Sequence, residues 1–454
     1  MQDILPYKKT TSSRLPGRLI LMNDLVLRGV RPAGGEPGDL FLHDGWLVDE
    51  VPPGAAVIDA DGLIALPGLV DPHCHLREPG SPAETIASGT AAAAHGGFTA
   101  VAAMPNTTPA CDNPDAAAWL QARAAAVQAA AQVVPVGAVT QGRAGHRLAD
   151  LVGLAGAGVR LFSDDGAAVA SDDLLREALL AVAPFGGVVA DHCQNPALAG
   201  PAAWRPDCLP ATLFEGIPGT GETTDPELWP ARAETSIVER DIQIAAETGC
   251  RVHLCHLSCA ESVEIVRWAK ARHIRVSTEV TPHHLFLTAD CLAAGGAAFK
   301  VNPPLRTPED IAALRDGLAD GTIDMIGTDH APHLAADKAK PLPQASPGLT
   351  GLEQALAVVI ETMINPGRID WPAVTRLMSA APAQLLGLNN QGRPLAAGQP
   401  ANLVLIDPTR RSLVQPEDSA SLARNNPYTG RDLPAPVIMT IWAGRITYQT
   451  PGLA

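Results

Sequence analysis

Cysteine is scarce in this chain, and the few that occur do not form a disulfide framework. There are eight in 454 residues, and no two are spaced as C-x-x-C. Cys250, Cys255 and Cys259 lie close together, but their spacing fits no zinc-ribbon pattern. We therefore expect free thiols, which are typical of the reducing cytoplasm, and we predict a cytoplasmic protein.

Long apolar runs are also missing. No stretch approaches the roughly 20 apolar residues that a membrane-spanning helix needs. The first residues, MQDILPYKKTTSSR, include some basic side chains, but no apolar stretch with a small-residue cleavage site follows them. We expect a loose tail over residues 1–16 rather than a secretory signal, and no membrane as a partner.

Positive charge is in deficit. Lysine and arginine number 33 against 48 aspartate and glutamate residues, which gives a net charge of −15. This balance disfavours nucleic acid and anionic membranes as partners. An anionic substrate would need a local cation to capture it, because the overall field repels it.

Strand-like and helical patterns alternate along the middle of the chain. Short apolar runs are separated by Ala- and Leu-rich stretches with helical apolar spacing. Eight such runs predict an α/β fold, a (β/α)8 TIM barrel over residues 66–390. A doubly wound sheet is the alternative, but no G-x-G-x-x-G turn follows a first strand. The eight candidate strands are residues 68–75, 98–105, 133–139, 158–166, 187–193, 251–258, 274–282 and 325–333.

Both ends of the chain have a different texture. Residues 17–65 and 391–454 contain short strands separated by turn residues. The segment from Asn195 to Pro230, rich in Pro, Gly and Thr, is too long for an ordinary βα loop. We interpret it as either a functional loop or a disordered insertion.

The stretch GLVDPHCHLREPG, at the first candidate strand, places two histidines and an arginine on one face. Alternate residues of a strand point to the same side, so His73, His75 and Arg77 lie together. A single histidine on a strand is usually a packing residue. Two on one face, ending at a turn, are more typical of half a metal site.

Other strands also end in polar residues, and in a barrel the chemistry lies at these ends. Seven of the eight deliver a metal ligand or an amide to the same rim, which isolated packing histidines do not readily explain. At the ends of the strands after the first, the polar residues are Asn106, Asp164, Asp165, Asp191, His192, His256, Asn302, Asp329, His330 and His333.

Neighbouring pairs among these residues cannot all face the centre. His253 and His256 differ by three positions, so on a strand they face opposite sides and only one reaches the metal. Asp164 and Asp165 are adjacent, so one points inward and the other caps the next loop or helix.

Simple structural interpretations account for further polar residues. His283 and His284 either orient the metal ligands or are structural. Asp112 and Asn113 precede Pro114 and are explained as helix caps. We expect surface or packing positions for His43, His95, His146 and His273.

Four histidines and two aspartates, without thiolate, suit zinc. Six protein ligands exceed what one catalytic zinc ion takes while keeping a water. Two metals that share a carboxylate and a hydroxide would use them all, and one metal with polar neighbours is the alternative.

The motifs in order resemble the dihydroorotases of the amidohydrolase superfamily, in particular the longer bacterial type. The matching stretches are DPHCHLREPG, GGFTAVAAMPNTTP, FSDDG, DHCQ, HLCHLS, EVTPHHLFLT, VNPPLR, GTDHAPH, ASPGLTGLE and NNPYTGRDL. They cover about residues 20–450. The resemblance implies a barrel whose β-rich ends, residues 17–65 and 391–454, join into a small β-sandwich domain.

The resemblance also implies a role for each site residue. His73, His75 and Asp329 would hold one Zn²⁺, and His192 and His256 the other, with Asp165 and a hydroxide as bridges. Asp329 would be the catalytic acid and base. The substrate-binding residues would be His75, Arg77, Asn106, Asn302, His333, Pro347 and Gly348.

The expected activity is the reversible, zinc-dependent cyclisation of N-carbamoyl-L-aspartate to dihydroorotate in pyrimidine biosynthesis. Many related cyclic amidases bridge their metals with a carboxylated lysine from the fourth strand. None of the six lysines of this chain lies there, so Asp165 must serve. A different cyclic amide substrate, and a non-catalytic partner of aspartate carbamoyltransferase, are the alternatives. Two associations are compatible with the sequence: a homodimer, and a complex of the active enzyme with aspartate carbamoyltransferase.

Overall fold

The computed structural model describes residues 20–21, 24–199 and 231–451. The expected tail over residues 1–16 lies outside these ranges, as does most of the Asn195 to Pro230 segment. No helix within the described ranges is long and apolar enough to cross a membrane.

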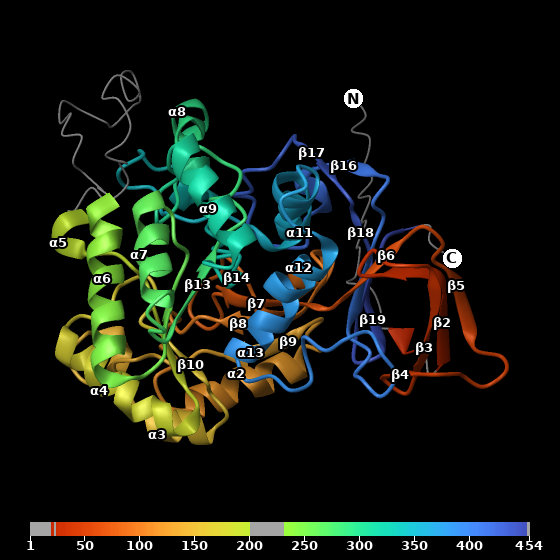
Figure 1. The fold of residues 1–454 in the computed structure, drawn as a ribbon, viewed down its shortest axis with the longest axis horizontal. Coiled ribbons are helices and arrows are strands. Elements are labelled where there is room, and N and C mark those ends of the chain that lie inside the picture. Colours follow the sequence, from red (N-terminus) through yellow and green to blue (C-terminus); the bar gives the residue numbers. More distant parts are fainter. Residues whose placement is uncertain (1–19, 22–23, 200–230, 452–454) are drawn as a thin grey trace, which may run out of the picture.

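Eight parallel strands form the centre of the larger part of the molecule (Figure 1). All eight coincide with the runs expected from the sequence. They are almost completely buried and rich in Val, Ala and Leu, as parallel strands covered on both faces are. They are β7 (Leu69–Cys74), β8 (Phe98–Ala103), β9 (Gln132–Pro135), β10 (Leu161–Phe162), β11 (Val188–Asp191), β12 (Val252–Leu254), β13 (Val276–Val280) and β14 (Met325–Ile326).

These strands pair as two parallel sheets, β7-β8-β9 and β10 to β14 in order. Single bridges connect the sheets at both junctions. Gly137 bridges Phe162 beyond β9, and Cys74 of β7 bridges His330 beyond β14. The backbone of Asp329 also donates to the carbonyl of His73, at 2.9 Å. The strand ends that carry the candidate site are therefore tied together directly.

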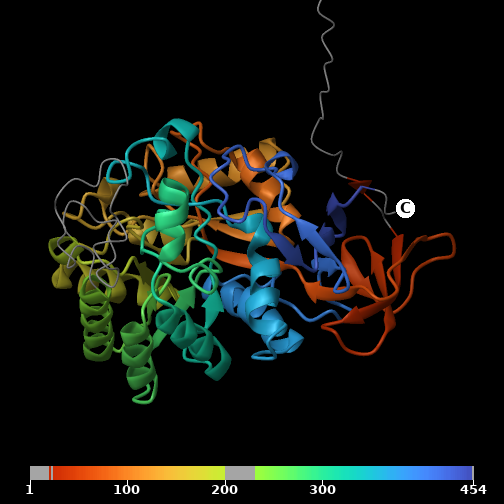
Figure 2. The same ribbon diagram turned by 90° about the horizontal axis from the view of Figure 1, so that it is seen from above.

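Helices follow the strands and pack around them (Figures 1 and 2). Local signals set their starts: Asn113 accepts from the backbone N–H of Ala116, and Pro114 occupies the first turn. The α-helices are α1 (Ile86–His95), α2 (Pro114–Ala126), α3 (Leu151–Gly156), α4 (Asp172–Val182), α5 (Pro196–Ala199), α6 (Ala231–Thr248), α7 (Ala260–Lys270), α8 (Asp290–Gly295), α9 (Pro308–Asp320), α10 (Ala335–Lys338), α11 (Ala355–Val359), α12 (Trp371–Thr375) and α13 (Ala381–Leu385).

Shorter helical turns complete the connections. The 3-10 turns are η1 (Gln141–Arg143), η2 (Ala183–Phe185), η4 (Gly296–Phe299), η5 (Leu352–Gln354) and η8 (Pro416–Asp418). Two π-helical stretches, η6 (Ile360–Ile364) and η7 (Arg376–Ala380), continue α11 and α12.

The two ends of the chain meet in one nine-stranded sheet beside the barrel strands (Figure 2). β6 pairs antiparallel with β15, and β1 with β19. The buried side chains of this sheet form their own apolar cluster, around Leu27, Leu42 and Leu403. Its strands are β1 (Ile20–Leu21), β2 (Asp24–Pro32), β3 (Gly38–His43), β4 (Trp46–Val48), β5 (Ala56–Asp59), β6 (Ile64–Pro67), β15 (Leu403–Ile406), β18 (Val437–Trp442) and β19 (Arg445–Gln449), with a separate pair β16 (Arg411–Leu413) and β17 (Asp432–Pro434).

Candidate active site

Strand ends bring the first group of candidate metal ligands together. Strand β7 carries His73 at its penultimate position, and His75 follows directly. The Nε2 atoms of His73 and His75 lie 3.2 and 3.5 Å from the two oxygens of Asp165, which follows β10. The ligand atoms of all three residues lie within 4.8 Å of one another, so they could hold a metal ion.

A second group shares one member with the first. Asp165, His192 and His256 also place their ligand atoms within 4.8 Å of one another. The two imidazole rings meet edge to face, with centroids 4.5 Å apart. A carboxylate common to both groups is what a bridge between two metals requires.

Asp329 lies against the first group, and its backbone is strained. Its Oδ1 is 3.0 Å from Nε2 of His75 and 3.8 Å from Nε2 of His73. The φ angles of Asp329, His256 and Arg77 are 44°, 30° and 60°. Positive φ is rare outside glycine, and such strain is typical of functional sites.

The charges of the cluster act differently on its members: burial lowers the pKa of His73, but Glu279 and Asp165 raise it well above its usual value, whereas the carboxylates stay ionised. Burial acts to raise the pKa of Asp165, but His73 and His75 hold it well below its usual range. The pKa of Asp329 is also lowered, because the hydrogen bond with His75 and the charge of His73 outweigh burial. Burial, with the charges of His192 and His73, lowers the pKa of His256 to about 3. Ionised carboxylates and a neutral imidazole are suitable ligands.

Buried nitrogens point to a ligand that the protein atoms do not supply. Nε2 of His73, Nδ1 of His192 and Nε2 of His256 are buried, and none makes a hydrogen bond to a described residue. A buried polar atom without a hydrogen bond is costly, and metal ions bound at the two groups would satisfy all three nitrogens. The donor set of nitrogen and carboxylate oxygen therefore fits a divalent metal.

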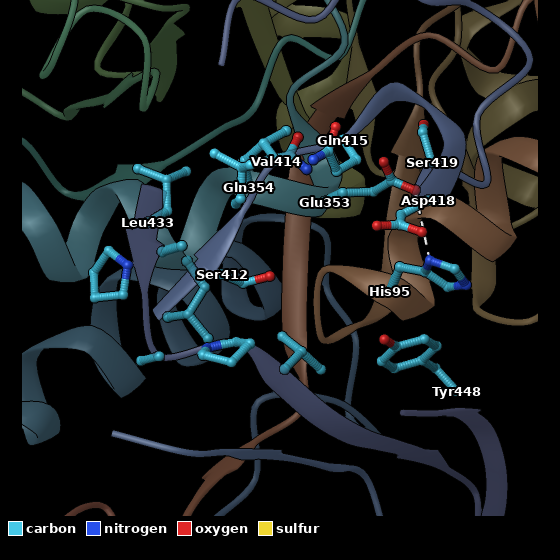
Figure 3. A pocket seen from close by; sticks show the side chains of 17 residues that line it. His95, Glu353, Gln354, Ser412, Val414, Gln415, Asp418, Ser419, Leu433 and Tyr448 are labelled. Atoms are coloured by element: carbon cyan, nitrogen blue, oxygen red, sulfur yellow. Dashed lines mark ion pairs between the residues drawn. The ribbon is translucent and has the colours of Figure 1, made fainter. Parts of the chain in front are cut away.

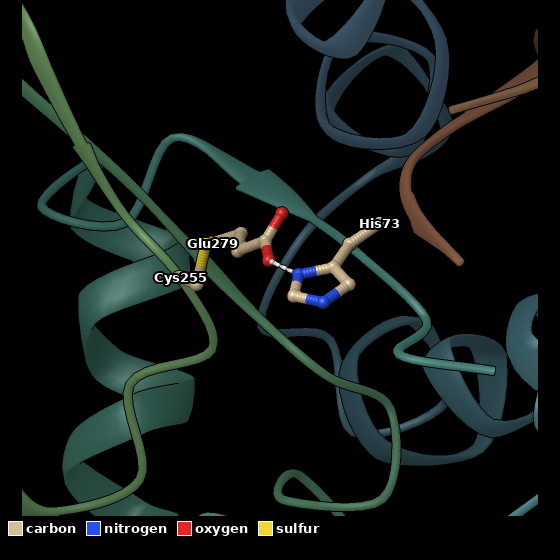
Figure 4. Close-up of side chains that lie close together, drawn as sticks. All are labelled: His73, Cys255 and Glu279. Carbon is tan, nitrogen blue, oxygen red and sulfur yellow. Dashed lines mark hydrogen bonds and ion pairs between the residues drawn. The ribbon is translucent and has the colours of Figure 1, made fainter. Parts of the chain in front are cut away.

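A third group, His73, Cys255 and Glu279, also brings its ligand atoms within 4.8 Å (Figure 4). Nδ1 of His73 lies 2.6 Å from Oε1 of Glu279. Burial raises the pKa of the Cys255 thiol, which keeps it protonated and makes it a poor ligand. This group therefore contacts the Nδ1 side of the His73 ring, opposite the nitrogen that faces Asp165.

Most of the predicted substrate-binding residues lie next to the cluster. Nη2 of Arg77 is 3.4 Å from Nε2 of His333, which in turn lies 2.7 Å from the carbonyl of Pro347. A β-carbon at Gly348, where φ is 133°, would lie 2.8 Å from the same imidazole nitrogen, so glycine is required. Arg77, His333 and Asn106 line a cavity of about 160 Å³.

The two predicted asparagines differ in position. Asn106 Oδ1 lies 2.9 Å from Nδ1 of His75, and its Nδ2 donates to Asp165 at 3.0 Å, so it also supports two ligands. Asn302 does not line the cavity beside Arg77. Its Nδ2 donates to Gln194 at 2.8 Å, and its buried Oδ1 makes no hydrogen bond to a described residue.

The structure resolves the neighbouring pairs. His256 joins the cluster, whereas His253 contacts Ser277 and Glu279. His256 lies beyond the end of β12 and has a φ angle of 30°, so strand alternation does not decide between the two. Asp164 accepts from the backbone N–H groups of Val139 and Thr140, at 3.0 Å each. We expected the aspartate that does not face the centre to cap the following loop or helix. This was wrong, because Asp164 instead holds the loop that precedes it in the sequence.

The adjacent residues His283 and His284 also differ in their contacts. His284 contacts the Thr281 hydroxyl at 2.8 Å and the Pro303 carbonyl at 3.1 Å, which is a structural arrangement. His283 is buried, and Nε2 makes no hydrogen bond to a described residue.

Two charged residues at the site were not singled out from the sequence. Glu279 lies behind His73, and Arg143 donates to the carbonyls of Asp164 and Asp165. A glutamate inside an apolar strand is itself a signal, because unpaired carboxylates are rarely buried. Arg143 follows the third strand, the one strand to which no polar candidate had been assigned.

Comparison with known proteins places the chain in a family. A model described as Dihydro-orotase-like matches residues 62–262, and one described as Amidohydrolase family matches residues 215–447. The dihydroorotase of Streptomyces coelicolor is 46% identical over 94% of this chain and 98% of its own. That of Mycobacterium tuberculosis is 44% identical over 93% of this chain and 98% of its own.

The chain belongs to the dihydroorotase family. The resemblance seen in its motifs is thereby confirmed. Among solved structures, the L-hydantoinase of Arthrobacter aurescens matches with a TM-score of 0.83 and 25% identity, covering 95% of this chain and 98% of the other. A dihydropyrimidinase from Brevibacillus agri matches with a TM-score of 0.80 and 23% identity, over 95% and 97%. Family membership and these neighbours indicate the TIM-barrel fold.

Proposed function

We propose that this protein is a zinc-dependent dihydroorotase, which interconverts N-carbamoyl-L-aspartate and dihydroorotate with loss or gain of water. The observation that carries the proposal is Asp165, which is common to two groups of potential metal ligands. The fourth strand offers no lysine, so an aspartate takes the bridging position. Family membership agrees with this reaction.

Two zinc ions would use the whole set of ligands. His73, His75 and Asp329 would hold one, His192 and His256 the other, and Asp165 would bridge them. When bound, zinc lowers the pKa of a coordinated water to about 7 and polarises the amide carbonyl under attack.

Asp329 moves the proton in this proposal. Its Oδ1 lies beside both His73 and His75, and its lowered pKa keeps it ionised and able to accept. In ring opening it takes a proton from the attacking water and delivers it to the leaving nitrogen. In ring closure the same carboxyl group acts in the reverse sense.

Arg77 captures the substrate carboxylate. Its planar guanidinium can make two parallel hydrogen bonds to a carboxylate, which offsets the repulsion from a chain of net charge −15. Asn106 and His333 line the same cavity and would orient the ring. Asn302, Pro347 and Gly348 would complete the pocket.

The architecture that holds this site is part of the proposal. We infer a closed (β/α)8 barrel over residues 66–390, flanked by a small β-sandwich domain from residues 17–65 and 391–454. The two single bridges at the junctions and the shared nine-stranded sheet support this division.

Metal analysis of the purified chain, together with turnover of N-carbamoyl-aspartate, tests the function. We expect about two zinc ions per chain and turnover in both directions. A side-by-side assay on dihydroorotate, hydantoin and allantoin separates this activity from other cyclic amidases. Zinc-loaded protein that turns over none of these substrates would favour a non-catalytic partner of aspartate carbamoyltransferase.

A further inference from the structure

A buried carboxylate stands directly behind one candidate metal ligand. Glu279 lies within β13 and is 1% exposed. Its Oε1 is 2.6 Å from Nδ1 of His73 (Figure 4). The other ring nitrogen, Nε2, lies 3.2 Å from Asp165. The carboxylate therefore contacts the side of the ring that does not face the metal position.

The other oxygen of Glu279 lies near a second imidazole. Oε2 lies 3.4 Å from Nε2 of His253, and Nδ1 of His253 lies 2.9 Å from the hydroxyl of Ser277. A line of buried contacts thus runs from Ser277 through His253 and Glu279 to His73. It connects β12 and β13 to the end of β7.

The neighbouring strand leaves room for this carboxylate. A β-carbon at Gly327 would lie 2.5 Å from Oε2 of Glu279 and 2.8 Å from its Cδ. Only glycine avoids this collision, so the backbone beyond β14 is shaped around the carboxylate. This is independent of the hydrogen bond to His73.

We propose that Glu279 is a positioning residue for the metal centre. By accepting the Nδ1 proton of His73 it fixes one tautomer and one ring orientation, which leaves Nε2 free to bind the metal. His253 lies on the other side of the carboxylate and contacts Ser277. The inference rests on the metal centre of the proposed function, but not on its substrate.

The test compares zinc affinity in the full-length wild-type chain and in Glu279→Gln, by competition with a chromophoric chelator. We expect about 10- to 100-fold weaker zinc binding, which is typical when the hydrogen-bond partner of a ligating histidine is removed. Gly327→Ala keeps the carboxylate but displaces it, so it should weaken zinc binding in the same direction. It also serves if Glu279→Gln fails to fold.

Glu84→Gln is the matched control. Glu84 is fully buried, and its Oε2 lies 3.5 Å from Nε2 of His330, which is not among the candidate ligands. We expect its zinc affinity to stay near the wild-type value even if its melting temperature falls. Wild-type affinity in both Glu279→Gln and Gly327→Ala, or an equal loss in Glu84→Gln, would overturn the inference. Because zinc affinity is measured without substrate, a failure of the dihydroorotase assay would leave this result unaffected.

Discussion

Individual side chains at the site are of two kinds: those that contact the reacting atoms, and those that orient the contacting side chains. Asp329 and Arg77 belong to the first kind in our proposal, and both adopt positive φ angles. Asn106 has both functions, because it lines the cavity and contacts His75 and Asp165. Substitutions of the first kind should therefore change rate or binding while the fold stays intact.

Replacing Asp329 with asparagine should nearly abolish turnover. The amide keeps the shape of the side chain but cannot accept the proton, a function typically worth about 100- to 10,000-fold in rate. Steady-state assays in both directions measure the loss. Zinc content and melting temperature, determined in parallel, show whether the metal and the fold are retained. Wild-type rates in this variant would refute the proposed proton transfer.

Replacing Arg77 with lysine should weaken substrate binding. Lysine keeps the charge but loses the planar fork that pairs with a carboxylate through two hydrogen bonds. One lost charge-assisted hydrogen bond is worth about 1.5–3 kcal/mol, so we expect the KM for dihydroorotate to rise at least tenfold. An unchanged KM and kcat would contradict this assignment.

Residues of the site differed in how readily the sequence revealed them. Five of the proposed metal ligands lie at or just beyond the ends of recognisable strands, so their convergence could be inferred from the barrel pattern. They are His73, His75, His192, His256 and Asp329. Glu279 could not be paired with His73 in this way, because 206 residues separate them and they lie on different strands, β13 and β7. Which of two adjacent residues faces inward, as at Asp164, also depends on packing that spacing does not encode.

Among the elements, the loop after α10 (Ala335–Lys338) is held by the half-buried Lys338 at the end of that helix. Nζ of Lys338 donates to the carbonyls of Ser346 at 3.0 Å and Gly348 at 2.8 Å. These contacts hold the backbone on either side of Pro347, beside His333. The amino group of Lys338 on α10 thus holds this loop in place.

Replacing Lys338 with methionine should loosen this loop and raise the KM about 5- to 10-fold, since one net hydrogen bond is worth about 1 kcal/mol. We expect a smaller effect on kcat, because the metal ligands lie elsewhere. Lys340→Met is the control: that side chain is 48% exposed and pairs with Asp337 at the surface. Equal KM values in the two variants would show that the hydrogen bonds of Lys338 to this loop do not affect substrate binding.

Strands and helices were largely predictable, but their connections were not. The apolar runs located all eight central strands, and Asn113 with Pro114 marked the start of α2. The single bridges at Gly137 and Cys74, in place of longer ladders, depend on the backbone geometry at the strand ends. Local sequence does not report that geometry.

On the scale of the whole molecule, a polar pocket lies where the barrel helices meet the C-terminal strands (Figure 3). It encloses about 140 Å³. Nδ1 of His95, at the end of α1, is 3.6 Å from Glu353, and its ring centroid is 4.2 Å from that of Tyr448 in β19. His95, expected to be an isolated packing or surface residue, thus joins three distant segments.

Stability should respond to the protonation of His95. Burial lowers its pKa to about 4, despite the opposing charge of Asp418, from an ordinary value of 6.5. Between pH 6.5 and 4 the unfolded chain takes up a proton there and the folded protein does not, so the free energy of unfolding falls as the pH falls. Because a third of the side chain is exposed, we expect a loss of about 1–2 kcal/mol.

Urea unfolding of the metal-free protein at pH 7.5 and 4.5 measures this effect. His95→Gln, which cannot titrate, should lose less stability between the two pH values than the wild type. His43→Gln is the control, since that imidazole lies at the surface beside Asp24 and its pKa is raised, not lowered. Parallel losses in His95→Gln and the wild type would contradict the assignment.

The pairing of β6 with β15 has a consequence for biosynthesis. During translation the early strands leave the ribosome with one open edge, and their partners are made only after every barrel strand has emerged. A nascent chain cut short before Leu403 would keep that edge exposed and prone to aggregate. The sheet shared by the two ends is thus completed only after the barrel strands have been synthesised.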